Sequence, residues 1–305
     1  MRSDRAERVR QNALSFDLED WFHAELVRSH VMTERPQRRV PWAVEPILTL
    51  LQRYDVKATF FVVGDVMRHH PQLVRRIYEG GHEIGCHGWS HRPLWSLAPE
   101  RFAQELEKFD REASSVLPQD EIMGFRAPTF SLDERTAWAI DMLRQHGYRY
   151  DSSVFPLRNY MYGVDRCPAC PYHPLSTALT KDHEEGEFVE FPLTAYRAVG
   201  LAIPVSGGFY LRAMPLFLLR YLLSRVNAAG DPFVIYMHPW EGDVETPRIK
   251  GLSPFERFVT YHNRASTLQK LEALLQRFRF APLRDVLGIE GGRRYPKGLE
   301  VDAHV

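Results

Sequence analysis

The feature of this 305-residue chain that most restricts its fold is a regular alternation of short apolar stretches and amphipathic ones. The apolar stretches are rich in β-branched and aromatic side chains and predict strands at residues 12–19, 56–63, 82–87, 187–193, 200–208 and 231–239. The amphipathic stretches space their apolar residues as helices do and predict helices at residues 41–55, 71–81, 98–117, 133–147, 214–226 and 263–279. This alternation indicates an α/β fold with parallel strands, and the number of units fits a closed or nearly closed barrel.

Composition excludes several classes of function. The 39 basic and 39 acidic side chains balance, so no overall positive field is present to hold nucleic acid or an anionic membrane. The charged N-terminal residues lack the apolar run of a secretory signal, and no stretch of 18 apolar residues predicts a membrane span. We therefore expect a cytoplasmic protein without an integral membrane segment and without a nucleic-acid partner. A single domain is expected over residues 12–288, between flexible tails at residues 1–11 and 289–305.

The three cysteines do not form a disulfide framework, because their number is low and odd. Cys167 and Cys170 have C-x-x-C spacing, but a structural zinc site needs a second pair of ligands. The segment around them therefore stays open between a metal-binding knuckle and a plain loop. The sequence carries no indication of the oligomeric state.

Polar side chains follow the predicted strands, at the positions where β/α barrels carry their reactive groups. They are Asp17, Glu19, Asp20, His87, His91, Arg126, Asp151, His238 and Glu241. Two imidazoles and a carboxylate suit zinc, cobalt, iron or nickel, and three protein ligands leave a coordination position for water. Each residue alone has an ordinary interpretation, such as a core histidine or a helix cap. Their shared position at strand ends favours one hydrolytic site.

Several motifs, taken in order, resemble the polysaccharide deacetylase (NodB-homology) family, carbohydrate esterase family four. They are SFDLEDWFH (15–23), GHEIGCHGWSH (81–91), GFRAPTFS (124–131), YDSSVFP (150–156), SGGFYLR (206–212), YMHPWE (236–241) and FRFAPLRDVL (278–287). More narrowly, the chain resembles the branch found in exosortase-associated exopolysaccharide loci. The resemblance covers the region of residues 12–288 and implies a distorted (β/α)7 barrel, in agreement with the alternation of strands and helices.

The resemblance implies a catalytic role for each matching position. Asp17 matches the catalytic base, and Arg126 matches the arginine that orients it. His238 matches the catalytic acid, and Asp151 matches the aspartate that pairs with this acid. Thr129 replaces an aromatic residue that often follows the Arg-x-Pro triplet, and the backbone N–H there is expected to stabilise the oxyanion. The neighbouring proline of the triplet, Pro128, is expected to line the pocket.

The implied metal ligands include one open choice. His87 and His91 match the two metal-binding histidines of the family. Many members carry two adjacent aspartates in the first motif, and the second binds the metal; Leu18 stands at that second place here. Residues two apart share one face of a strand, which favours Glu19 as the third ligand. Asp20 is the alternative if the strand ends at Leu18.

Substrate binding is expected to involve aromatic platforms beside the motif loops. Trp89, Trp240 and Tyr210 are the candidates for such contacts with a sugar. Tyr236 stands where the family usually has leucine, so a more polar pocket wall is expected. A structural role in the barrel is the alternative for these aromatic residues.

The resemblance implies a metal-dependent hydrolase that removes N-acetyl groups from amino sugars of an oligo- or polysaccharide, within exopolysaccharide biosynthesis. The metal is expected to be zinc, with cobalt, nickel or iron as alternatives. A metal-dependent amidase acting on a small cyclic amide, similar to allantoinase, is one alternative function. A non-catalytic carbohydrate-binding barrel is the other, although the complete set of base, acid and ligands argues against it.

Overall fold

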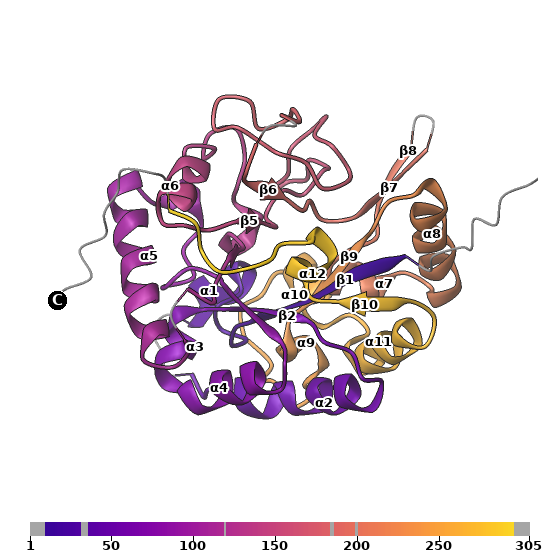
Figure 1. Cartoon of the computed structure of the whole chain (residues 1–305). Coiled ribbons are helices and arrows are strands. Elements are labelled where there is room, and N and C mark those ends of the chain that lie inside the picture. The colour runs from indigo at the N-terminus through magenta and orange to yellow at the C-terminus, as the bar shows by residue number, and fades with distance from the viewer. Residues whose placement is uncertain (1–9, 32–35, 119, 184–185, 199–200, 296–305) are drawn as a thin grey trace, which may run out of the picture.

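The computed structural model describes residues 10–31, 36–118, 120–183, 186–198 and 201–295 (Figure 1). Within these ranges, eight strands form one curled sheet in the order β10-β1-β2-β3-β4-β5-β6, with β9 also paired to β1. Every pairing in this sheet is parallel. The strands are β1 (Gln11–Leu18), β2 (Thr59–Val62), β3 (Glu83–Cys86), β4 (Gly124–Phe125), β5 (Tyr150–Asp151), β6 (Val189–Glu190), β9 (Val234–Met237) and β10 (Arg279–Ala281).

Strand β1 lies at the centre of the structure because it has partners on both edges. Ser15 pairs with Thr59 of β2 on one side and with Tyr236 of β9 on the other. Between β9 and β6, the Val234 N–H donates to the Thr194 hydroxyl at 2.8 Å, so a side chain links β9 to the segment after β6. The expected single-domain distorted (β/α)7 barrel is confirmed.

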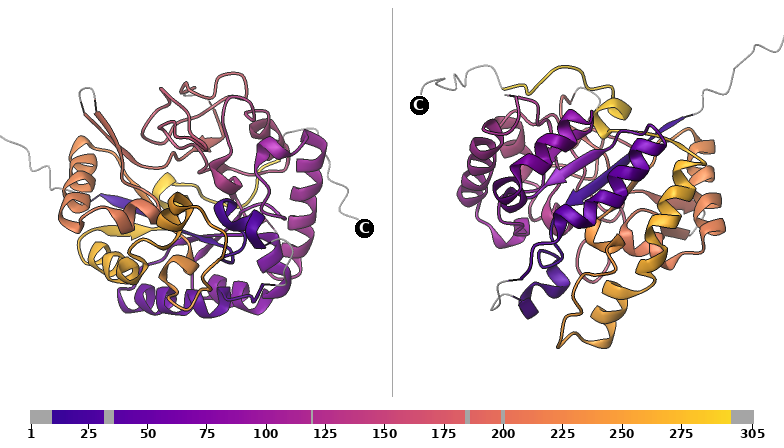
Figure 2. Two further views of the ribbon diagram at one scale, coloured as in Figure 1. Left: turned by 180° about the vertical axis from the view of Figure 1, so that it is seen from behind. Right: turned by 90° about the horizontal axis from the view of Figure 1, so that it is seen from below.

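Helices surround the outer face of this curled sheet (Figures 1 and 2). The helices of the described residues, some of which line the cavity instead, are α1 (Glu25–Val31), α2 (Val40–Arg53), α3 (Gly64–His69), α4 (Pro71–Glu79), α5 (Pro99–Ser114), α6 (Ala139–Gln145), α7 (Gly208–Ala213), α8 (Leu216–Ala229), α9 (Pro239–Gly242), α10 (Pro254–Tyr261), α11 (Thr267–Leu275) and α12 (Leu283–Leu287). Several begin with proline in the first turn, where a missing N–H breaks no helical bond. None of them, within the described ranges, has the length and apolar character needed to cross a bilayer.

The strand expected within residues 200–208 lies outside the barrel. Strand β8 (Leu201–Pro204) pairs antiparallel with β7 (Ala195–Ala198), and the two form a separate hairpin. An apolar run with the right composition does not determine which neighbour a strand finds. The helix expected at 133–147 is also shorter, because only Ala139–Gln145 is helical.

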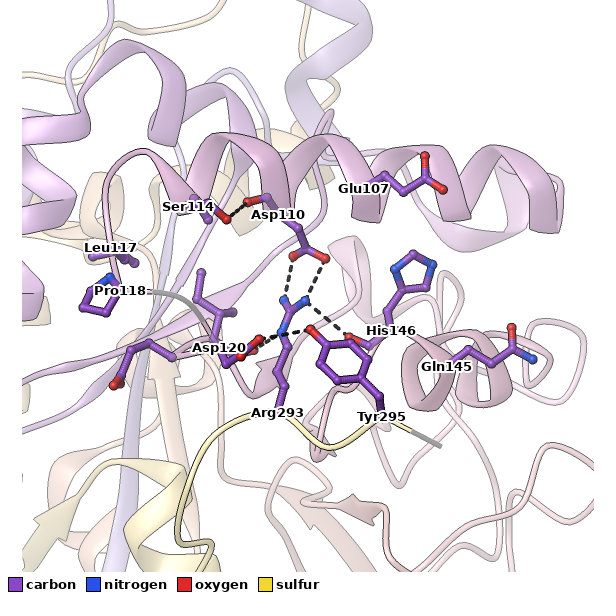
Figure 3. A pocket seen from close by; sticks show the side chains of 13 residues that line it. Glu107, Asp110, Ser114, Leu117, Pro118, Asp120, Gln145, His146, Arg293 and Tyr295 are labelled. Carbon is purple, nitrogen blue, oxygen red and sulfur yellow. Dashed lines mark hydrogen bonds and ion pairs between the residues drawn. The ribbon is translucent and has the colours of Figure 1, made fainter. Parts of the chain in front are cut away.

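The expected terminal tails are only partly within the described residues. Residues 1–9 and 296–305 lie outside them, and Gln11 already belongs to β1. The described part of the C-terminal segment packs on the barrel, as Figure 3 shows. Arg293 donates to both carboxylate oxygens of Asp110 on α5 at 2.7 and 2.6 Å, and the Tyr295 hydroxyl lies 3.0 Å from Asp120. Arg293 and Tyr295 therefore contact the barrel, while the expected bounds of the tail stay a prediction.

Candidate active site

The metal ligands predicted from the sequence converge at one point. Glu19 directly follows β1, and His87 and His91 lie in the turn after β3. One ligand atom from each residue lies within 4.8 Å of the others, and all three side chains are buried. This is the one cluster of its kind found among the residues that the structure describes. Strand ends have therefore brought together residues that are about 70 positions apart in the sequence.

The atoms of this cluster fit a divalent metal ion. Glu19 Oε2 is buried without a hydrogen-bond partner, although His91 Nε2 lies only 2.6 Å away, which suits two ligands directed at a shared cation. His87 Nδ1 lies 2.7 Å from the Arg126 carbonyl oxygen, and a proton donated there leaves Nε2 free to bind a metal. Burial lowers the pKa of His87 to about 4, so this imidazole is neutral near pH 7.

Glu19, rather than Asp20, belongs to this cluster. The Trp240 indole N–H donates to Glu19 Oε1 at 3.1 Å and so orients the carboxylate. Asp20 instead accepts the backbone N–H groups of Arg39 and Val40 at the start of α2. That position satisfies helix amides that would otherwise lack partners. The choice left open by the sequence is therefore decided by a helix end that the sequence did not reveal.

The turn that carries His91 is held from two sides by residues that the sequence analysis missed. His91 adopts a φ of 53°, which is unusual for a residue with a side chain, and such backbone strain is common at functional sites. Arg28 of α1 donates to the His91 carbonyl oxygen at 2.7 Å. Glu105 of α5 accepts from both the backbone N–H and the hydroxyl of Ser90, at 2.8 and 2.7 Å. No local motif signals these contacts, because they join distant helices to the turn.

Arg126 and Asp17 form the ion pair predicted from the sequence. Arg126 Nη1 donates to Asp17 Oδ1 at 2.7 Å, and both side chains are buried. The guanidinium also donates to the Ser15 hydroxyl and to the carbonyl and hydroxyl oxygens of Ser152, each at 2.9 Å. These contacts fix the guanidinium, which in turn holds one oxygen of Asp17. The other oxygen, Oδ2, lies 3.9 Å from His87 Nε2 and 3.8 Å from His238 Nε2.

The prediction that Asp151 pairs with His238 is wrong, because Glu241 occupies that place. Glu241 Oε2 accepts the backbone N–H of His238 at 3.0 Å and lies 3.0 Å from its Nδ1. Glu241 Oε1 accepts two bonds from the buried Arg212 guanidinium at 3.1 and 2.9 Å. Although burial lowers the pKa of His238, the nearby carboxylates of Glu19 and Glu241 raise it to about 9 overall.

Asp151 takes part in a different buried network. Its carboxylate accepts from the Ser153 hydroxyl at 2.5 Å and from the Ser153 N–H at 3.1 Å. Glu190 of β6 accepts from the N–H groups of Ser153 and Val154 at 3.2 and 2.9 Å. Burial, followed by the adjacent Asp151 carboxylate, raises the pKa of Glu190 well above its ordinary value. Both carboxyl groups therefore support the loop after β5.

A cavity of about 370 Å³ opens above the cluster and tests the remaining predictions. Thr129, Tyr210 and Trp240 line it, together with Asp17, His238, Glu19, His87 and His91. Trp89 and Pro128 are buried but are not among the described residues that line this cavity. Their predicted contact with substrate is therefore not supported by their positions.

Among the described residues, the cysteines of the C-x-x-C segment belong to no cluster of potential metal ligands. Cys167 is buried, Cys170 is half-buried and both are free thiols. Burial raises the pKa of the Cys167 thiol to about 12, which disfavours the thiolate that metals bind. The plain-loop interpretation of this segment agrees with its surroundings.

The fold and the cluster together define a parallel β/α-barrel protein with a candidate mononuclear metal centre at the carboxyl ends of its strands. Two family models match consecutive parts of the chain. The polysaccharide deacetylase model matches residues 39–150, and a domain of unknown function, DUF3473, matches residues 152–288. Residues 39–150 thus carry a polysaccharide deacetylase domain, and the second match fits the exopolysaccharide-locus branch that the motifs of the chain resemble.

Individual relatives agree with this assignment. A chitooligosaccharide deacetylase of Bradyrhizobium sp. is 33% identical over 88 residues, which cover 29% of this chain and 40% of the relative. The crystal structure of a probable polysaccharide deacetylase from Pseudomonas aeruginosa PAO1 has a TM-score of 0.57 at 14% identity and covers 90% of this chain and 88% of that one. An allantoinase has a TM-score of 0.56 at 12% identity, covering 90% and 87%. Similar folds thus occur in a protein named as a probable polysaccharide deacetylase and in one named as an allantoinase.

Proposed function

We propose that this protein is a metal-dependent hydrolase that removes N-acetyl groups from amino sugars in an oligo- or polysaccharide. The observation that carries the proposal is the convergence of a buried ion-paired aspartate, a carboxylate-bound histidine and three metal ligands on one cavity. Relatives named as deacetylases and the fit of the DUF3473 match support a polymer of the exopolysaccharide kind as the substrate.

Glu19, His87 and His91 would hold the metal ion, and zinc suits two imidazoles and one carboxylate best. When bound, such an ion supplies Lewis-acid polarisation of the amide carbonyl and lowers the pKa of water. Trp240 and the Arg126 carbonyl oxygen keep two of these ligands oriented.

Asp17 acts as the general base. Arg126 binds its Oδ1, so Oδ2 is the oxygen directed toward the histidines of the cavity. A carboxylate oxygen directed into the cavity is positioned to accept a proton from water. The arrangement therefore supplies a base whose orientation is set by a single fixed contact.

His238 acts as the general acid. Glu241 holds Nδ1, which leaves Nε2 to face the cavity and to donate a proton to the departing amine nitrogen. Water adds to the amide carbonyl before this C–N bond breaks and supplies one oxygen of the released acetate, and the sugar keeps the free amine. A backbone N–H near Thr129, which lines the cavity, is the candidate donor to the developing oxyanion.

Acetate release from N-acetylglucosamine oligomers tests this function. We expect the full chain loaded with zinc or cobalt to release acetate, and we expect dipicolinate to abolish the release until metal is added back. Unchanged release after verified metal removal would contradict metal dependence. Hydrolysis of allantoin in place of the oligomers would favour the amidase alternative.

A further inference from the structure

Two exposed aromatic side chains stand at the mouth of the catalytic cavity. Tyr160 is 69% exposed and belongs to the long loop between β5 and β6, and Phe255 is 52% exposed and belongs to the first turn of α10. Their ring centroids lie 5.3 Å apart at an interplanar angle of 80°, and both residues line the cavity. Exposed rings that meet beside a cavity form an apolar surface that a ligand can cover.

The backbone under both rings is held locally. Asn159 Oδ1 accepts the N–H groups of Met161 and Tyr162 at 2.8 and 2.9 Å, which fixes the turn that presents Tyr160. On the other side, Ser253 caps α10, and its N–H and hydroxyl exchange hydrogen bonds with Glu256 at 2.7 and 3.2 Å. Such a capping box fixes the first turn of a helix. The ring pair is therefore positioned before any ligand arrives.

The charges of the cavity restrict what this surface can receive. Among the described lining residues, Arg212 carries the one guanidinium, and it is 1% exposed and already bound to Glu241. Glu19 and Glu25 add carboxylates to the lining, and its described residues include no lysine and no second arginine that could hold a phosphate group. An uncharged ligand fits this lining better than a phosphorylated one. The carbon-bound hydrogens on one face of a pyranose ring can pack against the negative face of an aromatic ring.

We propose that Tyr160 and Phe255 form a binding subsite for the sugar next to the N-acetylated one, in an uncharged oligosaccharide. This inference rests on the proposed deacetylase function, which places the N-acetyl group at the metal ligands. It assigns substrate recognition to the part of the chain matched by DUF3473, because both residues lie within residues 152–288. The length of the oligosaccharide, rather than a charged group on it, then determines how tightly it binds.

Calorimetric titration of the metal-free full chain tests the subsite separately from catalysis. The probes are N-acetylglucosamine, its tetramer and uridine-diphosphate N-acetylglucosamine. We expect Tyr160→Ala and Phe255→Ala each to weaken tetramer binding by about 5- to 30-fold, as truncation of an aromatic contact commonly does, and to leave monomer binding unchanged. Tyr160→Phe keeps the ring and should bind the tetramer as the wild type does. Phe217→Ala removes an equally exposed ring from α8, outside the cavity lining, and is the matched control.

The outcomes separate the two proposals. Tetramer binding that is absent in the wild type, or unchanged in both alanine variants, would overturn the subsite. Tighter binding of the nucleotide sugar than of the tetramer would overturn its preference for an uncharged ligand. Tetramer binding that depends on both rings, without acetate release after metal loading, would support the subsite and contradict the deacetylase function alone.

Discussion

Glu241 contacts His238 twice, because one carboxylate oxygen lies 3.0 Å from both the backbone nitrogen and the ring Nδ1 of the histidine. Both residues belong to the start of the one-turn helix α9, where Glu241 stands three positions after His238. A contact made within a single turn can hold the ring without help from a distant strand. The second oxygen of Glu241 is occupied by Arg212, which fixes the carboxylate itself.

This relationship predicts different effects for two conservative substitutions. Glu241→Gln should lower kcat for acetate release by about 100-fold or more, since a misplaced general acid commonly costs that much. Asp151→Asn should retain most of the activity, because Asp151 bonds to Ser153 rather than to the acid. Initial rates of zinc-loaded protein, compared at matched thermal stability, check both. Loss of activity in the Asp151 variant alone would restore the assignment made from the motif.

A second prediction concerns Gly208, at the start of α7. A Cβ added to this glycine would overlap the Glu241 carboxylate, so Gly208→Ala should displace Glu241 from His238. We expect kcat to fall while the metal content stays at the wild-type level, since no metal ligand is touched. Gly80→Ala, where the nearest atom lies 3.2 Å from the new Cβ, is the control. Equal kcat in both variants would show that the carboxylate tolerates the shift.

Metal content should depend on His91. Removing an outer contact of a metal ligand lowers affinity by about 10- to 100-fold, so His91→Ala, which removes a ligand itself, should lower zinc affinity by at least about 100-fold. Elemental analysis after dialysis against a weak chelator measures the bound zinc. His69→Ala changes a histidine of α3 that lies beside Asp65, and it should keep the wild-type content. Full occupancy in the His91 variant would remove this residue from the ligand set.

Stability should depend on pH through Glu190. The folded chain keeps a proton on this buried group that the unfolded chain releases above its ordinary pKa of 4.5. The free energy of unfolding should therefore fall as pH rises above that value. In the Glu190→Gln variant the side-chain amide carries hydrogens at every pH and can still donate to Asp151. The free energy of unfolding of this variant should therefore fall less as pH rises. Urea unfolding at pH 5 and pH 8 checks this, with the exposed Glu107→Gln as control. An equal fall in the free energy of unfolding for the wild type and Glu190→Gln would contradict a proton held on Glu190.

The sequence predicts those site residues whose position follows from parallel strands. Asp17 lies near the end of β1, His87 and His238 directly follow β3 and β9, and strands of one barrel end at one rim. Glu19 follows from alternation along β1, since it faces the same side as Asp17. These inferences need only local periodicity and a shared direction of the strands.

The residues that were missed depend on contacts between distant segments. Asp151 is bonded to Ser153 rather than to His238, and the strand expected at residues 187–193 does not by itself show that its Glu190 lies beside Asp151. One signal was available for Glu241, since the order His-Pro-Trp-Glu has the spacing of a capping box. Tyr160 and Phe255 are 95 positions apart in the sequence, and no pattern along the chain announces that their rings meet.

Strand β1 is paired on both edges, and this pairing affects which parts of the protein mutation can alter. Amides of such a strand exchange with solvent only when the whole domain opens, whereas a loop and a one-turn helix start open at much lower free energy. Asp17 lies on this central strand and Glu19 directly follows it, whereas Tyr160 stands on a loop and Phe255 on the first turn of a helix. Under the proposed function, mutation of the two rings should therefore change oligosaccharide binding and leave the residues proposed for the reaction in place.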